Sequence, residues 1–140
     1  MKDKNTFKHS CLQTGLLLGF LGWFISFIFT FSSWEFSTKI LYGMGAKNIE
    51  YQPLLDYWLK MASSAFGCLG LLFFTAYRNN NQYKNLIPLL GYGSIFIGII
   101  LLISGMNNSL KADLHPTRYI DLLFCFGVGT LIIYGHKTEK

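Results

Sequence analysis

The 140-residue chain is rich in apolar side chains: 51% of its residues are hydrophobic and only 14% are charged, about half the charged fraction of a soluble domain. The formal net charge is +5 at pH 7, but the lysines and arginines are scattered and form no basic stripe, which argues against a nucleic-acid partner. Four long apolar stretches exclude an ordinary soluble domain and predict an integral membrane protein whose first partner is the lipid bilayer.

The first apolar stretch, 10–34, contains no charged residue and predicts a transmembrane helix near 12–32. Lys2, Lys4 and Lys8 precede it and would suit the basic region of a signal peptide. The stretch is, however, roughly twice as long as the apolar region of a signal peptide, and no small-x-small cleavage site follows it. We therefore interpret it as a retained first helix.

Residues 32–52 separate the first and second apolar stretches and predict a short amphipathic helix on the outer membrane surface. Ser32 and Glu35 have the spacing of a capping box. Phe36, Ile40 and Met44 follow at four-residue intervals, so they would share one apolar face that lies on the bilayer. The alternative is an irregular loop held by a few hydrophobic anchors.

Three prolines mark the starts of the remaining helices. Proline is tolerated in the first helical turn because the N–H groups there have no intrahelical partner. Pro53, Pro88 and Pro116 therefore predict transmembrane helices near 54–77, 86–106 and 117–135. Together with the first helix they predict one all-α domain over 1–140, an integral membrane four-helix bundle.

Small residues recur at three- and four-residue spacing along three of the predicted helices, among them Gly15, Gly19, Gly67, Gly70 and Gly98. Such spacing lets helix backbones approach closely, which matters in lipid because the hydrophobic effect does not drive helices together there. It predicts tight packing within the bundle, with the first helix at the centre. Alternatively, these faces bind other membrane subunits or a second copy of the chain.

Charge asymmetry predicts the orientation. The N-terminus, the segment 78–85 and the C-terminus hold seven lysines and arginines, against five in the opposite flanks, and the acids of the loops and helix starts lie on that opposite side. Because cytoplasmic flanks are enriched in Lys and Arg, both termini should lie in the cytoplasm. We expect the bacterial inner (plasma) membrane.

The three cysteines show no C-x-x-C or zinc spacing, so we predict no metal site and no cofactor. Cys68 and Cys125 should lie at different depths, because rise along helices that start at Pro53 and Pro116 puts them about 22 Å and about 14 Å deep. That offset exceeds the reach of a disulfide. We predict buried, unpaired thiols.

Ionisable residues gather at the outer ends of the second and fourth helices. Asp56 and Lys60 are four residues apart, and His115, Arg118 and Asp121 follow at intervals of three. These five residues are the candidate ligand-binding residues, with Asp121 at the centre because it lies furthest into a predicted span. No catalytic residue is assigned.

The same five residues also suit a structural role, since acids near helix N-termini complement the helix dipole and long cationic side chains reach the headgroups. Asp121→Asn separates the two: lost ligand retention with unchanged melting favours a site, and lost stability alone favours structure. No ionisable residue falls near the bilayer centre, which argues against an ion-coupled transporter.

Several segments resemble those of small four-helix membrane proteins of bacteria, a family with no assigned activity. The resemblance is carried by DYWLKM at 56–61, SSAFG at 63–67, HP at 115–116, Asp121, FC at 124–125 and Gly127. It implies fold and location only. The leading hypothesis for function is a non-enzymatic subunit or accessory factor that packs through its glycine faces. The alternative is a membrane enzyme, or a protein that binds a lipid or small molecule at the outer Asp/His/Arg cluster.

Overall fold

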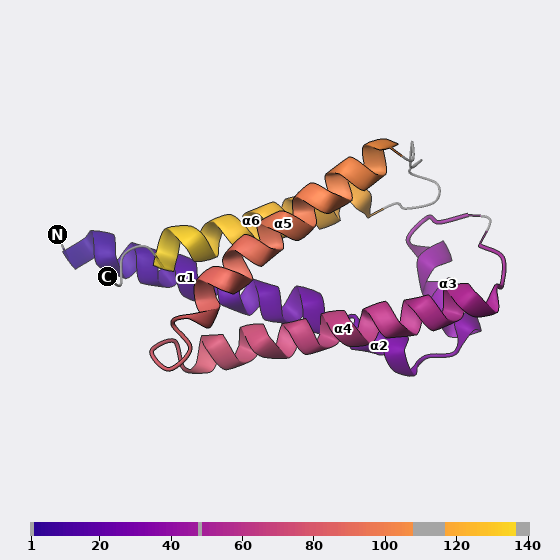
Figure 1. The fold of residues 1–140 in the computed structure, drawn as a ribbon, viewed down its shortest axis with the longest axis horizontal. Coiled ribbons are helices and arrows are strands. Elements are labelled where there is room, and N and C mark those ends of the chain that lie inside the picture. The colour runs from indigo at the N-terminus through magenta and orange to yellow at the C-terminus, as the bar shows by residue number, and fades with distance from the viewer. Residues whose placement is uncertain (1, 48, 108–116, 137–140) are drawn as a thin grey trace.

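The computed structural model describes residues 2–47, 49–107 and 117–136, with 2–5 as backbone alone. All regular structure in these ranges is helical (Figure 1). The helices are α1 (Lys2–Phe24), α2 (Phe27–Phe31), α3 (Trp34–Gly43), α4 (Pro53–Arg78), α5 (Leu86–Asn107) and α6 (Arg118–His136). His115 and Pro116, the predicted start of the last helix, lie outside the described residues.

Four helical spans of the described chain are long and apolar enough to cross a membrane, which confirms the predicted number. They are Thr6–Phe31, Pro53–Arg78, Leu86–Asn107 and Arg118–His136. Pro53 is the first residue of α4, and Pro88 lies in the first turn of α5, as expected. The first backbone N–H groups of α5 are satisfied by the carbonyl of Tyr83, which accepts from Leu86 and Ile87.

The first span differs from the single helix predicted near 12–32. It begins earlier, because no glycine or proline interrupts residues 2–12, and it breaks after Phe24. At the break the hydrogen bonds shorten to three-residue steps, from Ser26 N to Trp23 O (3.2 Å) and from Ile28 N to Ile25 O (3.1 Å). This tighter turn ends α1 and begins α2 on a new axis.

The long helices pack in the spatial order α4, α1, α6, α5. α1 contacts both α4 and α6, α5 contacts mainly α6, and the contact between α4 and α5 is small. α2 continues along α4. In Figure 1 the α5–α6 pair and the α4–α2 pair therefore diverge beyond the end of α1, and α3 lies near the start of α4. We call these pairs the two arms.

Glycines let the helices approach, and the chain's own side chains occupy the space beside them. A Cβ on Gly19 would meet the ring of Phe73, and one on Gly67 would meet the ring of Phe27. Other glycines meet backbone: a Cβ on Gly70 would lie 2.6 Å from the nitrogen of Phe24. The small-residue faces of the sequence are therefore helix-packing surfaces within this chain.

The three cysteines are free thiols. Cys125 is buried and Cys11 is half-buried, but Cys68 is exposed on the surface of α4. The prediction of a buried thiol was wrong for Cys68, because its neighbour Gly67 takes the inward-facing position on the helix.

The capping residue of α3 is Ser33, one position later than predicted. The Ser33 hydroxyl oxygen accepts from the N–H of Phe36 at 3.3 Å. Ser32 instead ends the preceding helix, where its hydroxyl donates to the carbonyl of Ile28. α3 is thus a defined helix, whose Ser37 and Thr38 are buried while Phe36 and Met44 are exposed.

Candidate functional site

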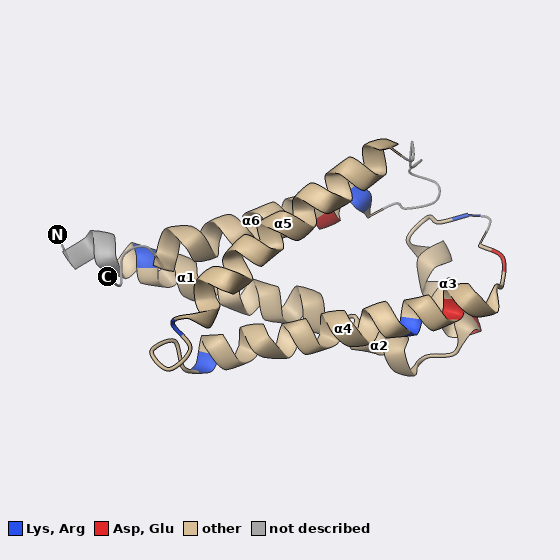
Figure 2. Ribbon diagram, in the orientation of Figure 1, with Lys and Arg blue, Asp and Glu red and all other residues tan. Residues whose placement is uncertain are grey.

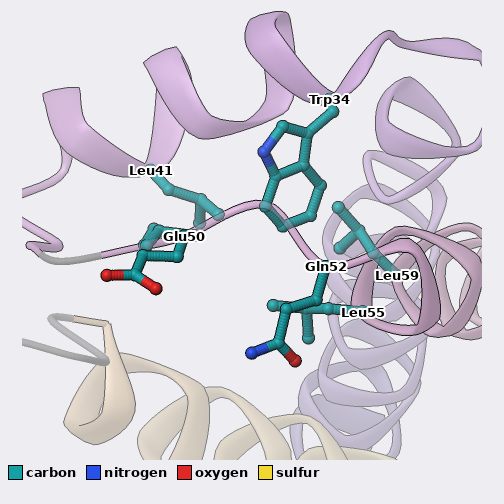
Figure 3. A pocket seen from close by; sticks show the side chains of 7 residues that line it. Trp34, Leu41, Glu50, Gln52, Leu55 and Leu59 are labelled. Atoms are coloured by element: carbon teal, nitrogen blue, oxygen red, sulfur yellow. The ribbon is translucent and has the colours of Figure 1, made fainter.

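A pocket of the described chain lies where α3, the segment 46–52 and the start of α4 meet (Figure 3). Its volume is about 410 Å³, within the range of pockets that hold small molecules. The lining residues are Trp34, Leu41, Ile49, Glu50, Gln52, Leu55 and Leu59. The pocket is therefore mainly apolar, with one carboxylate and one amide.

The end of α3 folds the chain back to form one wall of this pocket. Gly45 has φ 103°, a left-handed conformation that suits glycine, and it follows the last turn of the helix. The N–H of Gly45 donates to Tyr42 O, and the N–H of Ala46 donates to Leu41 O, both at 3.0 Å. These two bonds form the Schellman arrangement of a helix C-terminus.

Two further contacts hold the returning segment in place. The hydroxyl of Tyr42 donates to the carbonyl of Ile49 at 2.9 Å. The rings of Trp34 and Tyr51 meet edge to face, with 5.5 Å between their centroids. In Figure 3 the indole of Trp34 points into the pocket toward Leu55 and Leu59, and the Glu50 carboxylate lies at the opposite side. All of the pocket's described lining residues lie within 34–59.

Asp56 and Lys60 form an ion pair on α4, next in sequence to the lining residues Leu55 and Leu59. Lys60 Nζ lies 2.7 Å from Asp56 Oδ2. The other carboxylate oxygen, Oδ1, is buried and has no hydrogen-bond partner among the described residues. The pair lies beside the pocket but does not line it.

Arg118 and Asp121 lie on the other arm, at the start of α6 (Figure 2). Asp121 Oδ2 accepts from the hydroxyl of Thr117 at 3.0 Å. The Arg118 guanidinium lies against Gly105 of α5 and 5.5 Å from the centroid of the Tyr119 ring. Neither residue lines the pocket. The structure thus places the described candidates in two groups, one on each arm, and His115 lies outside the described residues.

None of the seven lining residues is among the five candidates predicted from the sequence. The sequence signal that could have indicated this pocket is the presence of an aromatic residue, Trp34, and an acid, Glu50, near the two ends of the segment 32–52. The lining residues come together because the chain turns back at Gly45. The amphipathic pattern of 32–52 predicted a helix but not this turn.

A second cavity, of about 190 Å³, lies between α4 and α5. Its lining is almost entirely apolar, and the hydroxyl of Ser94 in its wall already donates to Leu90 O at 2.9 Å. It therefore offers no free polar group to select a ligand.

Glu35, at the start of α3, has its pKa below the usual value of 4.5. The causes are hydrogen bonds to its carboxylate from its own backbone N–H and then from the Ser33 hydroxyl. Because the pKa is lower in the folded protein, this stabilisation of α3 is present above the usual pKa and is lost as the pH falls through the folded value.

We expect Ser33→Ala to raise the pKa of Glu35 toward 4.5, because one donor to the carboxylate is removed. An NMR titration of the Glu35 carboxyl carbon measures this. Ser32→Ala is the control, since Ser32 bonds Ile28 instead. An equal rise in both variants would contradict the assignment of Ser33 as the cap.

Among the described residues, no three His, Cys, Asp or Glu side chains are grouped to hold a metal ion. Comparison with known proteins gives no relative from which a function might be transferred: no family model, curated protein or solved structure matches this chain.

Proposed function

We propose that the protein is a small, non-enzymatic binding protein of the bacterial inner membrane, and that it holds an amphiphilic molecule in the pocket between α3 and α4. The observation that carries this proposal is the pocket itself. It joins a leucine- and tryptophan-lined interior to a carboxylate and an amide at its edge. Such a division suits a ligand with an apolar body and a polar head.

The position of the pocket along the chain supports a ligand drawn from the bilayer. The pocket lies at the first two turns of the membrane-crossing helix α4, where a headgroup and the beginning of an acyl chain would be found. Trp34, Tyr51, Tyr57 and Trp58 surround this end of α4, and Tyr and Trp are enriched at such boundaries.

An enzyme is less well supported by the arrangement of charges. Acid–base chemistry would require the outer carboxylates and cations to meet around a common space. Asp56 is instead paired with Lys60 on one arm, while Arg118 and Asp121 lie on the other. The accessory-subunit hypothesis stays a prediction, but its partners would have to bind faces other than those of the packed glycines. The space beside these glycines is filled by the chain itself, at Gly15, Gly19, Gly67, Gly70 and Gly98 among others.

The proposed topology has four helices packed as a bundle, both termini in the cytoplasm and α3 on the outer surface. The apolar side chains of Phe36 and Met44, exposed on α3, would then rest on the bilayer. The resemblance to small four-helix membrane proteins of bacteria accords with this arrangement and is part of the proposal.

Cysteine labelling tests the topology. In a chain without its native cysteines, a membrane-impermeant reagent added outside should label Lys47→Cys and should not label Gln82→Cys. Both positions are exposed and in connecting segments, so reactivity reports the side of the membrane. Labelling only at position 82 would invert the model.

Filling the pocket tests the binding function. We expect Leu59→Trp to weaken binding of myristoyl lysophosphatidylethanolamine about tenfold, the equivalent of about 1.4 kcal/mol, because the larger ring occupies the cavity. Native mass spectrometry of the full chain from maltoside micelles measures the bound lipid. Leu71→Trp is the matched control, because Leu71 is exposed on α4 and does not line the pocket. Equal binding by the wild type and both variants would refute the proposal.

A further inference from the structure

We infer that the ligand of this pocket carries an ammonium group, which Glu50 binds at the pocket edge. The inference rests on the proposed binding function and adds to it the chemical class of the ligand: an amphiphile with a cationic amine in its head. Three features of the site lead to it.

The first feature is the charge of the lining. Glu50 is the only charged residue among the described lining residues, and it is an acid. It is exposed and forms no ion pair with any described residue, so its carboxylate is available to a ligand. A carboxylate accepts hydrogen bonds and donates none, so it selects a head that carries N–H donors or a positive charge.

The second feature is the aromatic group at the same site. Trp34 lines the pocket, and its ring is held edge to face by Tyr51. Tryptophan presents a large apolar ring surface. Trp34 thus offers that surface to the body of the ligand, at the side of the pocket opposite Glu50, and leaves the polar head to the carboxylate.

The third feature is the disposition of the protein's own cations. Lys60, the single lysine of α4, is held by Asp56 at 2.7 Å and does not line the pocket. Lys39 and Lys47 are exposed and are not lining residues either. The acid of the pocket is therefore not neutralised from within, and an anionic head would meet Glu50 without a compensating cation in the lining.

The test compares two lysophospholipids that share a myristoyl chain. Lysophosphatidylethanolamine carries an ammonium group and lysophosphatidylglycerol does not. In Glu50→Gln we expect the ratio of their affinities, ethanolamine over glycerol, to fall about fivefold, the size expected for one exposed ion pair. Glu35→Gln, which changes another outer acid that does not line the pocket, should leave the ratio unchanged.

Glycerophosphoethanolamine, which has the head but no acyl chain, separates an amphiphile from a free amine. We expect no measurable binding, because the leucine-lined part of the pocket would stay empty. Binding as tight as that of the lysolipid would overturn the requirement for an acyl chain.

The outcomes for the ligand class and for the proposed function are distinct. An unchanged ratio in Glu50→Gln would overturn the ammonium inference, while weaker binding of both lipids to Leu59→Trp would still support the pocket. If Leu59→Trp binds both lipids as the wild type does, the proposed function fails, and the inference that rests on it fails too.

Discussion

Gly129→Ala should lower the stability of the protein by about 1–3 kcal/mol, the usual cost of overfilling a packed interior. A Cβ at this position of α6 would lie 2.7 Å from the carbonyl oxygen of Gly91 and 2.6 Å from Ile95 Cγ1, both on α5. A backbone carbonyl cannot turn aside as a flexible side chain can. The methyl group would therefore push α5 and α6 apart along their shared surface.

Gly127→Ala is the matched control, two residues earlier on the same helix. Nothing lies within 4 Å of a Cβ built there, so the substitution should be neutral or stabilising, because alanine favours the helix over glycine. Thermal melting in detergent, followed by circular dichroism, measures both variants. If both melt at the wild-type temperature, the α5–α6 contact is looser than described.

The same geometry applies to other glycines. Gly19 faces the ring of Phe73, which is fully buried, whereas Gly70 faces the backbone of Phe24. Neither neighbour has room to move, so substitutions at Gly19 and Gly70 should both be destabilising. The sequence alone indicated which positions are small, but only the helix order shows which of them meet backbone.

The helical spans were largely predictable because each depends on a local signal. Apolar length set their number, and Pro53 and Pro88 set two of their starts within one or two residues. The break after Phe24 was not predictable in this way. No proline or glycine lies at residues 24–27, and the turn there follows from packing against α4, where Gly70 admits the backbone of Phe24.

The candidate site was harder to predict, because it depends on contacts between segments. Asp56 and Lys60 could be paired from their spacing alone, and the structure forms that pair. Whether Asp121 approaches them depends on how α6 is placed. α6 packs on α1 and α5, so its N-terminal end, with Asp121, belongs to the arm opposite α4. Sequence spacing carries no information about that separation.

The junction of the two arms leads to a second large effect, at Trp23. This residue lies at the end of α1 and is 7% exposed. Its ring lies 5.0 Å from that of Phe66 on α4 and 5.7 Å from that of Phe124 on α6, measured between centroids. Trp23 thus connects the arms just before they diverge, and its removal should leave a cavity that neither arm can fill.

Trp23→Ala should destabilise the protein by about 3–5 kcal/mol, the range for truncating a buried aromatic side chain. Trp23→Phe should be much milder. The indole N–H of Trp23 is buried and has no hydrogen-bond partner among the described residues, so phenylalanine retains a ring and removes an unsatisfied donor. Trp58→Ala is the matched control, because Trp58 is 51% exposed on α4.

The arm-to-arm distance distinguishes this role from general loss of packing. Spin labels can be attached at Met61→Cys on α4 and Leu123→Cys on α6, because both positions are exposed. In a chain without native cysteines, pulsed electron paramagnetic resonance then measures the distance between the two labels. We expect a broader distribution in Trp23→Ala and an unchanged one in Trp23→Phe and Trp58→Ala. An unchanged distribution in Trp23→Ala would mean that α1 holds the arms through its glycine contacts alone.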